Sequence, residues 1–326
     1  MRLQPSVRVL AICIERRLRY LARISRKGMI MNIIDFHVHA GVFDLLRDDI
    51  QELLTRRPFE PDIQISEVFS QPDKMESYLV RNGVVKAVVI AECGPGTEFT
   101  IDSEMIVRHC AGKDMFIPFG NINPNHHDTS DEFWKSLRLG VKGFKFYPAD
   151  HSFDPLIEPM WEVYRLSARL GLPIIFHTGL TAQRDTEQRF IDPFDFKPIA
   201  EAYPDLVLIL AHGGKPLWHK EAMEMAINFP NVYIDTALLD PAGLAGAFPD
   251  LRVMRDKIVF GSDWPVVGSY SALMEKYREI DLADDLLQGI FHGNATKILS
   301  NALSRQQVTV PRILAERSGR TSAVRN

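Results

Sequence analysis

The sequence predicts an α/β protein folded as a (β/α)8, or TIM, barrel. From residue 32 onward, eight short apolar runs alternate with stretches of helical character. The runs are almost continuously hydrophobic, as parallel strands are when both faces are covered. Eight strand–helix units over about 270 residues match a barrel in number and size. A doubly wound open sheet is the alternative, but the even spacing and the lack of G-x-G-x-x-G after the first run count against it.

Each expected strand is a run rich in β-branched and aromatic residues. The runs are residues 32–39, 85–91, 116–122, 143–147, 173–178, 206–212, 232–237 and 258–263. Between them the pattern predicts helices. The clearest covers residues 159–171 and ends at Gly171, and the others cover 219–229, 270–281 and 284–302.

Two connections are longer than the rest. Residues 40–75 follow the first run and residues 179–197 follow the fifth, and both are rich in Asp, Arg and Pro. Long connections in a compact domain are often lids or binding loops. Because both follow strands, we expect them on the catalytic face of the barrel.

Charge divides the chain into three parts. Residues 1–30 carry a net charge of +7 and residues 304–326 one of +4, so the total of −4 leaves −15 on the middle. We expect residues 1–30 to be a basic extension outside the fold, arising from a start set too early, a surface helix or a targeting segment. Residues 31–303 would form the barrel, and residues 304–326 a basic C-terminal tail. A body this acidic disfavours nucleic acid as a partner.

The composition also restricts location. The three cysteines are scattered and form neither a zinc-type pair nor a disulfide framework, which predicts a cytoplasmic setting. The sequence contains no run of eighteen apolar residues, so we expect no membrane-spanning helix.

Histidines and other polar residues end several of the expected strands. His37 and His39 lie two apart, so their side chains point to the same side of the first strand. Later runs carry Lys145, His177, His212 and Asp263. Because catalytic residues of this fold sit at the carboxyl ends of its strands, we expect these groups to meet in a metal centre rather than to be buried polar structure.

As an ordered set, five segments resemble the amidohydrolase superfamily, and more closely its amidohydrolase-related branch of aminocarboxymuconate semialdehyde decarboxylase and pyrone dicarboxylate lactonase. They are D-F-H-V-H (35–39), I-I-F-H-T-G (174–179), L-A-H-G-G (210–214), G-S-D-W-P (261–265) and G-N-A-T-K-I-L (293–299), and the likeness spans residues 32–302. The resemblance implies that one divalent metal, most often zinc, is held by His37, His39, His177 and Asp263. It also implies that His212 assists the metal-bound water.

Lys145 leaves the number of ions open. Its segment G-F-K-F-Y-P-A is similar to the K-x-Y-P-A around the carboxylated lysine of dihydroorotase. That likeness implies a second metal at Lys145, His177 and His212, whereas otherwise the lysine would bind a substrate carboxylate or close the barrel mouth. We favour one ion over two, and ligand type alone also admits manganese, iron or cobalt.

The resemblance implies hydrolysis by a metal-activated water. Zinc lowers the pKa of bound water to about 7, so hydroxide forms at neutral pH. Asp263 would move its proton, and His212 would polarise the carbonyl or hold the oxyanion. The substrate would be an amide, lactone or ester of a small carbonyl compound. The alternative is a metal-dependent, non-oxidative decarboxylase of a small carboxylic acid; an inactive scaffold would have lost ligand positions, and none is lost.

Weaker expectations concern residues beside this centre. Candidate substrate contacts are Glu92, Asn121, His151, Arg184, Arg189 and Trp264. We expect His126 and His127 to be solvated loop residues. The partner would be a small molecule, with neither nucleic acid nor membrane, and homodimers are common in the branch.

Overall fold

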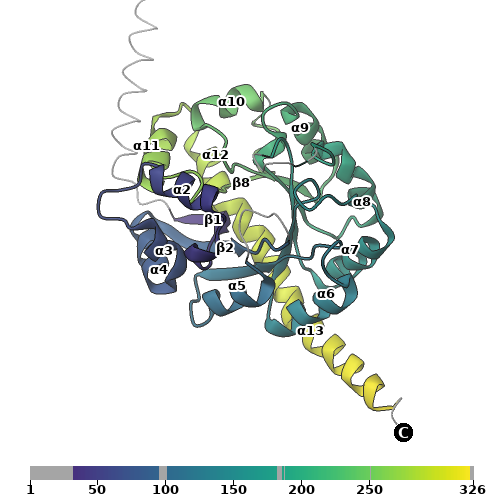
Figure 1. The fold of residues 1–326 in the computed structure, drawn as a ribbon. Helices are drawn as coiled ribbons and strands as arrows, with labels where there is room; N and C mark the ends of the chain where they lie inside the picture. The colour runs from purple at the N-terminus through teal and green to yellow at the C-terminus, as the bar shows by residue number, and fades with distance from the viewer. Residues whose placement is uncertain (1–31, 95–100, 182–185, 187, 250, 324–326) are drawn as a thin grey trace, which may run out of the picture.

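The computed structural model describes residues 32–94, 101–181, 186, 188–249 and 251–323. It confirms the barrel: eight parallel strands follow one another around a single sheet in sequence order, with helices outside them (Figure 1). Residues 1–30 lie outside the described residues, so their predicted independence from the fold stays a prediction.

Every predicted run overlaps one strand. The strands are β1 (Ile33–His39), β2 (Val84–Ile90), β3 (Phe116–Gly120), β4 (Gly143–Phe146), β5 (Ile174–His177), β6 (Leu208–Ala211), β7 (Val232–Asp235) and β8 (Ile258–Val259). Most are shorter than predicted, chiefly at their carboxyl ends. Beyond β8, the backbone amides of Phe36 and His39 still donate to the carbonyls of Phe260 and Trp264, both at 2.8 Å, and these bonds join the last strand to the first.

Helices connect the strands as expected, with two differences. The helices are η1 (Phe43–Leu45), α2 (Asp48–Arg56), α3 (Ile65–Ser70), α4 (Pro72–Arg81), α5 (Ser103–Cys110), α6 (Thr129–Leu139), α7 (Glu158–Leu170), η2 (Pro193–Phe196), α8 (Lys197–Ala202), η3 (His212–Gly214), α9 (His219–Asn228), η4 (Pro241–Gly243), α10 (Leu244–Ala247), α11 (Tyr270–Glu279), α12 (Asp284–Gln288), η5 (Gly289–Gly293) and α13 (Asn294–Ala323). The connection at 40–75 is largely helical. The helix predicted over 284–302 is divided by the π-turn η5.

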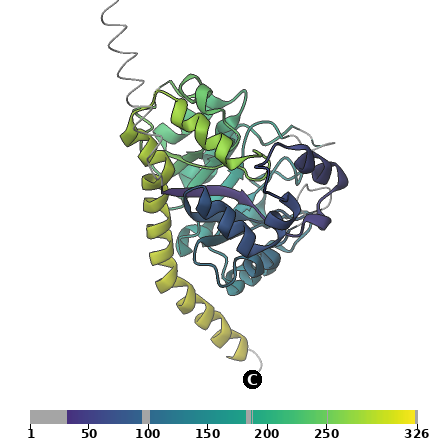
Figure 2. The same cartoon turned by 90° about the vertical axis from the view of Figure 1, so that its left-hand side faces the viewer.

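The barrel interior is closed at its amino-terminal end by α13. Ala295, Ile298 and Leu299 pack against inward-facing strand residues such as Ile34 and Phe36. Figure 2 shows this helix lying along the end of the barrel from which β1 begins. The apolar plug leaves the opposite end of the strands for polar chemistry.

Helix α13 continues past the predicted start of the tail at residue 304. The Gln306 side chain donates to the carbonyls of Lys142 and Gly171, both at 2.9 Å, and Ile313 is buried. The basic C-terminal segment therefore begins as a helix packed on the barrel. Among the described residues, no helix is both long enough and apolar enough to cross a membrane.

A buried histidine far from the strand ends makes the fold sensitive to acid. His109 on α5 places Nε2 3.3 Å from Sδ of Met75, and burial lowers its pKa to about 4. Below pH 6.5 the unfolded chain binds a proton here that the folded chain does not, so stability falls as the pH falls. From pH 7 to pH 5 we expect this group to remove about 2 kcal/mol from the free energy of unfolding.

Urea unfolding at both pH values tests this effect. His109→Leu should lose about 2 kcal/mol less than the wild type over that interval. Equal losses in the two proteins would show that His109 is not the group responsible.

Candidate metal centre

The ends of β1 and β8 bring two histidines onto one carboxylate. Oδ1 of Asp263 lies 3.0 Å from Nε2 of His39 and 3.6 Å from Nε2 of His37. The register of β1 against β2 shifts between Asp35 and Val38. Such an irregularity re-aims side chains. It allows Phe36 to pack inside the barrel while His37 and His39 both face the site.

The ends of β5 and β6 supply two more imidazoles. The rings of His177 and His212 are 4.5 Å apart between centroids, and those of His37 and His212 are 4.9 Å apart. One ligand atom each from His37, His212 and Asp263 lies within 4.8 Å of the others. The structure therefore gathers all five predicted groups, and Nδ1 of His212 lies 3.8 Å from Oδ2 of Asp263.

Two of these residues have a left-handed backbone. His212 has φ of 62° and Asp263 has φ of 61°. This conformation costs a non-glycine residue of order 1–3 kcal/mol and persists where the surroundings impose it, often at functional sites. Here it directly follows β6 at His212 and lies beyond the end of β8 at Asp263, and both side chains face the site.

Asp235 at the end of β7 is a site residue that the sequence analysis missed. Its Oδ2 lies 2.7 Å from Nδ1 of His37, and its Oδ1 accepts from the amides of His212 at 2.8 Å and Ala237 at 3.0 Å. The carboxylate keeps the proton of His37 on Nδ1, which leaves the Nε2 lone pair facing Asp263. An acid inside the seventh predicted run was the signal available for it.

The tautomer of His212 is fixed in the same way. Its Nδ1 lies 3.1 Å from the Ala237 carbonyl, which can only accept, so Nδ1 carries the proton. Nε2 of the neutral ring therefore presents a lone pair. This suits metal binding or accepting a hydrogen bond better than holding an oxyanion.

The Asp35 carboxylate accepts hydrogen bonds from the first strand and from the segment after the last strand. Its Oδ1 accepts from the amides of His37 and Ser262, both at 3.0 Å, and its Oδ2 from the Tyr270 hydroxyl at 3.1 Å. Burial raises the pKa of Asp35 to about 6, against the lowering effect of these hydrogen bonds. Its contacts thus place it behind the site rather than in it.

Burial favours the neutral form of His39, His177 and His212, while Asp263 stays charged. Burial lowers the pKa of His39, and lowers those of His177 and His212 well below the usual range. Burial alone would raise the pKa of Asp263, but the neighbouring histidines hold it well below its usual value. Neutral imidazoles and an ionised carboxylate are the forms in which these groups bind metals.

Lys145 lies inside the barrel with no exposed surface. Phe144 and Phe146 beside it belong to the outer apolar layer, so strand alternation sends the lysine inward. Within the described residues its Nζ has no hydrogen-bond partner and lies 4.9 Å from the ring centroid of Tyr147. Burial lowers its pKa to about 8, against the opposing effect of Asp235, Asp263 and other carboxylates.

The candidate substrate contacts fall into different environments. Asn121 is committed to backbone, because its Oδ1 accepts from the Cys93 amide and its Nδ2 donates to the Lys145 carbonyl. Trp264 points away from the site and packs against Tyr78 in the outer apolar layer. Glu92 is buried beside the site end of β2.

His151 follows β4 and stands beside Tyr147. Both its ring nitrogens are buried and, among the described residues, lack hydrogen-bond partners. Burial lowers its pKa to about 3. Arg184 lies outside the described residues, whereas Arg189 is described and its guanidinium lies 5.0 Å from the Phe190 ring centroid.

The donor set fits a divalent ion. Ligand atoms of His37, His212 and Asp263 lie within 4.8 Å of one another, and Nε2 of His39 lies 3.0 Å from the same carboxylate. The nearby Nε2 of His177 is buried without a hydrogen-bond partner among the described residues. A buried polar atom left unpaired costs free energy, which a metal bond would recover. Nitrogen and carboxylate ligands suit zinc and also manganese.

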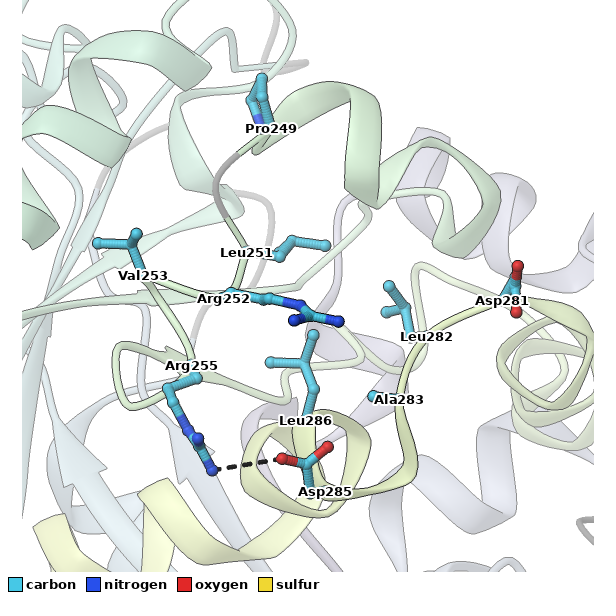
Figure 3. Close-up of a pocket in the computed structure, with 10 residues that line it drawn as sticks. All are labelled: Pro249, Leu251, Arg252, Val253, Arg255, Asp281, Leu282, Ala283, Asp285 and Leu286. Carbon is cyan, nitrogen blue, oxygen red and sulfur yellow. Dashed lines mark hydrogen bonds and ion pairs between the residues drawn. The ribbon is translucent and has the colours of Figure 1, made fainter. Parts of the chain in front are cut away.

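A large pocket elsewhere in the molecule is separate from this centre. It has a volume of about 560 Å³ and lies between the segment before β8 and the segment that leads into α12 (Figure 3). Its lining residues are Pro249, Leu251, Arg252, Val253, Arg255, Asp281, Leu282, Ala283, Asp285 and Leu286. Arg255 contacts Asp285 at 3.3 Å on its wall. No histidine lines it, so it offers none of the chemistry found at the strand ends.

Gly261 permits the close approach of the chain to the site. A Cβ there would lie 2.9 Å from Cβ of His37 and 3.3 Å from Cβ of Asp235. We expect Gly261→Ala to lower the free energy of unfolding by about 1–3 kcal/mol and to weaken metal binding, because it displaces this pair. Urea unfolding and elemental analysis measure the two effects.

Gly246→Ala in α10 is the matched control, since nothing lies within 4 Å of a Cβ placed there. It should be neutral or slightly stabilising. Equal behaviour of the two variants would mean that the site tolerates the added methyl group.

The amidohydrolase family model matches residues 34–300. No curated protein sequence matches the chain. Among solved structures, an uncharacterised TIM-barrel protein, Bb4693 from Bordetella bronchiseptica, is 21% identical with a TM-score of 0.71, covering 83% of this chain and 99% of its own.

Two further structures share the fold at lower identity. A probable 2-pyrone-4,6-dicarboxylic acid hydrolase from Acinetobacter baumannii, with citric acid bound, is 13% identical with a TM-score of 0.57, covering 83% of this chain and 100% of its own. A 5-carboxyvanillate decarboxylase from Novosphingobium aromaticivorans, complexed with manganese and 4-hydroxy-3-methoxy-5-nitrobenzoic acid, is 16% identical with a TM-score of 0.59, covering 83% and 96%. The family match extends over nearly the whole barrel, including all the polar strand ends. The chain therefore belongs to the amidohydrolase family and is a metal-dependent enzyme.

Proposed function

We propose that this enzyme hydrolyses an amide, lactone or ester bond of a small carbonyl compound, with one divalent ion at the strand ends. The observation that carries the proposal is the Asp263 carboxylate, which lies within reach of His37, His39 and His212. A buried anion beside neutral imidazoles can bind an ion and also move a proton. We propose zinc as the native metal; the manganese in the decarboxylase structure makes manganese the second candidate.

Each group has a separate task in this proposal. His37, His39, His177 and Asp263 would hold the ion, which supplies Lewis-acid activation of water and carbonyl when bound. Asp263 accepts the proton of the attacking water and returns it to the leaving group. His212 orients that water by accepting its hydrogen bond at Nε2, as the fixed tautomer allows.

Lys145 and His151 would form the substrate side of the site. A buried ammonium without a partner is unfavourable, and a carboxylate or carbonyl oxygen of the substrate would relieve it. We therefore favour a substrate with an anionic group and propose that Lys145 acts without a second ion. Glu92 and Arg184 stay candidate contacts, and the cytoplasmic setting and the homodimer stay predictions from the sequence.

Decarboxylation is the second candidate. It is favoured by the name of the manganese-containing structural neighbour, and it would use the same site. The two reactions differ in the fate of water, because only hydrolysis places a water oxygen in the organic product.

The test uses purified enzyme loaded with zinc or manganese in ¹⁸O-labelled water. Probes are 2-pyrone-4,6-dicarboxylate, 5-carboxyvanillate and a panel of small lactones, esters and amides. Label in an acid product without CO2 would support hydrolysis. CO2 release with no label in the remaining organic product would reject it in favour of decarboxylation.

A further inference from the structure

We propose that Cys93, His126 and His127 form a second metal site for a borderline-soft divalent cation such as Zn²⁺. One ligand atom from each residue lies within 4.8 Å of the others. The group shares no residue with the centre at the strand ends. It depends on the fold, because Cys93 follows β2 whereas the two histidines lie between β3 and α6.

The backbone around these side chains is held in place before any ion binds. The Cys93 amide donates to Oδ1 of Asn121 at 3.1 Å. The amides of His126 and His127 both donate to the Asn123 carbonyl, at 3.0 and 2.8 Å. This turn places the two ring centroids 4.9 Å apart, so the consecutive histidines can bind the same ion.

Nearby carboxylates disfavour a free thiolate anion at Cys93 and favour a bound cation. Burial raises the pKa of Cys93 to about 11, and Asp102 and Glu132 add to the rise, while Lys135 acts in the opposite direction. The thiol is therefore neutral without an ion. On binding, the S–H bond breaks, a sulfur–metal bond forms, and the proton passes to solvent.

His127 must change its tautomer to take part through Nε2. Its Nδ1 now accepts from the Asn123 amide at 3.1 Å, which places the proton on Nε2. Binding at Nε2 moves that proton to Nδ1 and gives up this hydrogen bond. The loss is small beside the affinity of Zn²⁺ for a thiolate and two imidazoles.

This environment differs from the one expected from sequence. His126 is exposed, but His127 is half-buried, and Cys93 is only partly accessible. Three protein ligands leave one coordination position for water. An ion held here would fasten the segment after β2 to the segment after β3, beside the mouth of the barrel.

The experiment uses Co²⁺ as a spectroscopic probe on the full-length, metal-stripped protein. A thiolate–Co²⁺ bond gives an intense charge-transfer band in the near ultraviolet, which imidazole and carboxylate ligands do not. The site variants are Cys93→Ser, His126→Ala and His127→Asn, because asparagine retains an acceptor near the Nδ1 position but lacks Nε2. The matched controls are Cys13→Ser and Cys110→Ser, and Asp263→Asn disables the proposed catalytic centre.

We expect the band in the wild type, in both cysteine controls and in Asp263→Asn. The band should be lost in Cys93→Ser. In each histidine variant, the Co²⁺ affinity obtained from the band should fall at least tenfold. Zn²⁺ should abolish the band by competition. A wild type without the band, or a band unchanged by Cys93→Ser or by both histidine variants, would overturn the proposal whatever the fate of the catalytic centre.

Discussion

Asp263→Asn is expected to lower turnover by at least about a thousand-fold, because the variant loses both the proton carrier and an anionic metal ligand. Asparagine retains the shape of the side chain, and Asn also tolerates a left-handed backbone such as φ of 61°. The change therefore tests chemistry rather than folding. Turnover of the substrate found in the labelled-water experiment and elemental analysis of the purified variant are the two measurements.

Asp256→Asn serves as the control for Asp263→Asn. Asp256 is exposed and contacts Lys297 at 2.9 Å, so its loss should change little. Full turnover and full metal content in Asp263→Asn would refute the proposed centre.

Asp235→Asn should have the second-largest effect, and through a different route. The new amide can still accept from the amides of His212 and Ala237, but its NH2 group would face Nδ1 of His37. His37 would then move its proton to Nε2, the atom proposed to bind the ion. We expect metal affinity to fall about 10–100-fold, with turnover lost in parallel at limiting metal.

Excess metal should restore much of the turnover of Asp235→Asn, because the catalytic groups themselves remain. No such rescue is expected for Asp263→Asn. Asp240→Asn, at an exposed carboxylate 3.5 Å from Lys276, is the control. An unchanged metal affinity in Asp235→Asn would show that the contact with His37 does not govern binding.

Much of the barrel was predictable because its strands have a one-dimensional signature. Parallel strands covered on both faces are nearly continuous apolar runs, so eight could be counted directly. Their ends then placed His37, His39, His177, His212 and Asp263 in one region. The convergence follows from topology alone, since all carboxyl ends of the strands meet at one end of a barrel.

Other features depended on geometry that the sequence pattern does not carry. The inward turn of Asp263 sends the next residue, Trp264, to the outer layer, so proximity in sequence was a poor guide to its contacts. To predict the role of Asp235, one would have to know that the end of β7 lies beside the His37 ring. Helix α13 continues through residues 304–323, and Gln306, Val310 and Ile313 pack on the barrel, which the basic charge of this segment did not indicate.

The joint between the first and last strands has a consequence for dynamics. The backbone amide of Asp263 donates to the carbonyl of His37, and the amide of His39 donates to the carbonyl of Trp264. His37, His39 and Asp263 thus both close the barrel and belong to the proposed metal ligands. A ligand that binds only the closed form stabilises it against opening. Release of the ion and opening of the joint would then occur together. Amide hydrogen exchange along the joint would therefore report how tightly the enzyme binds its metal.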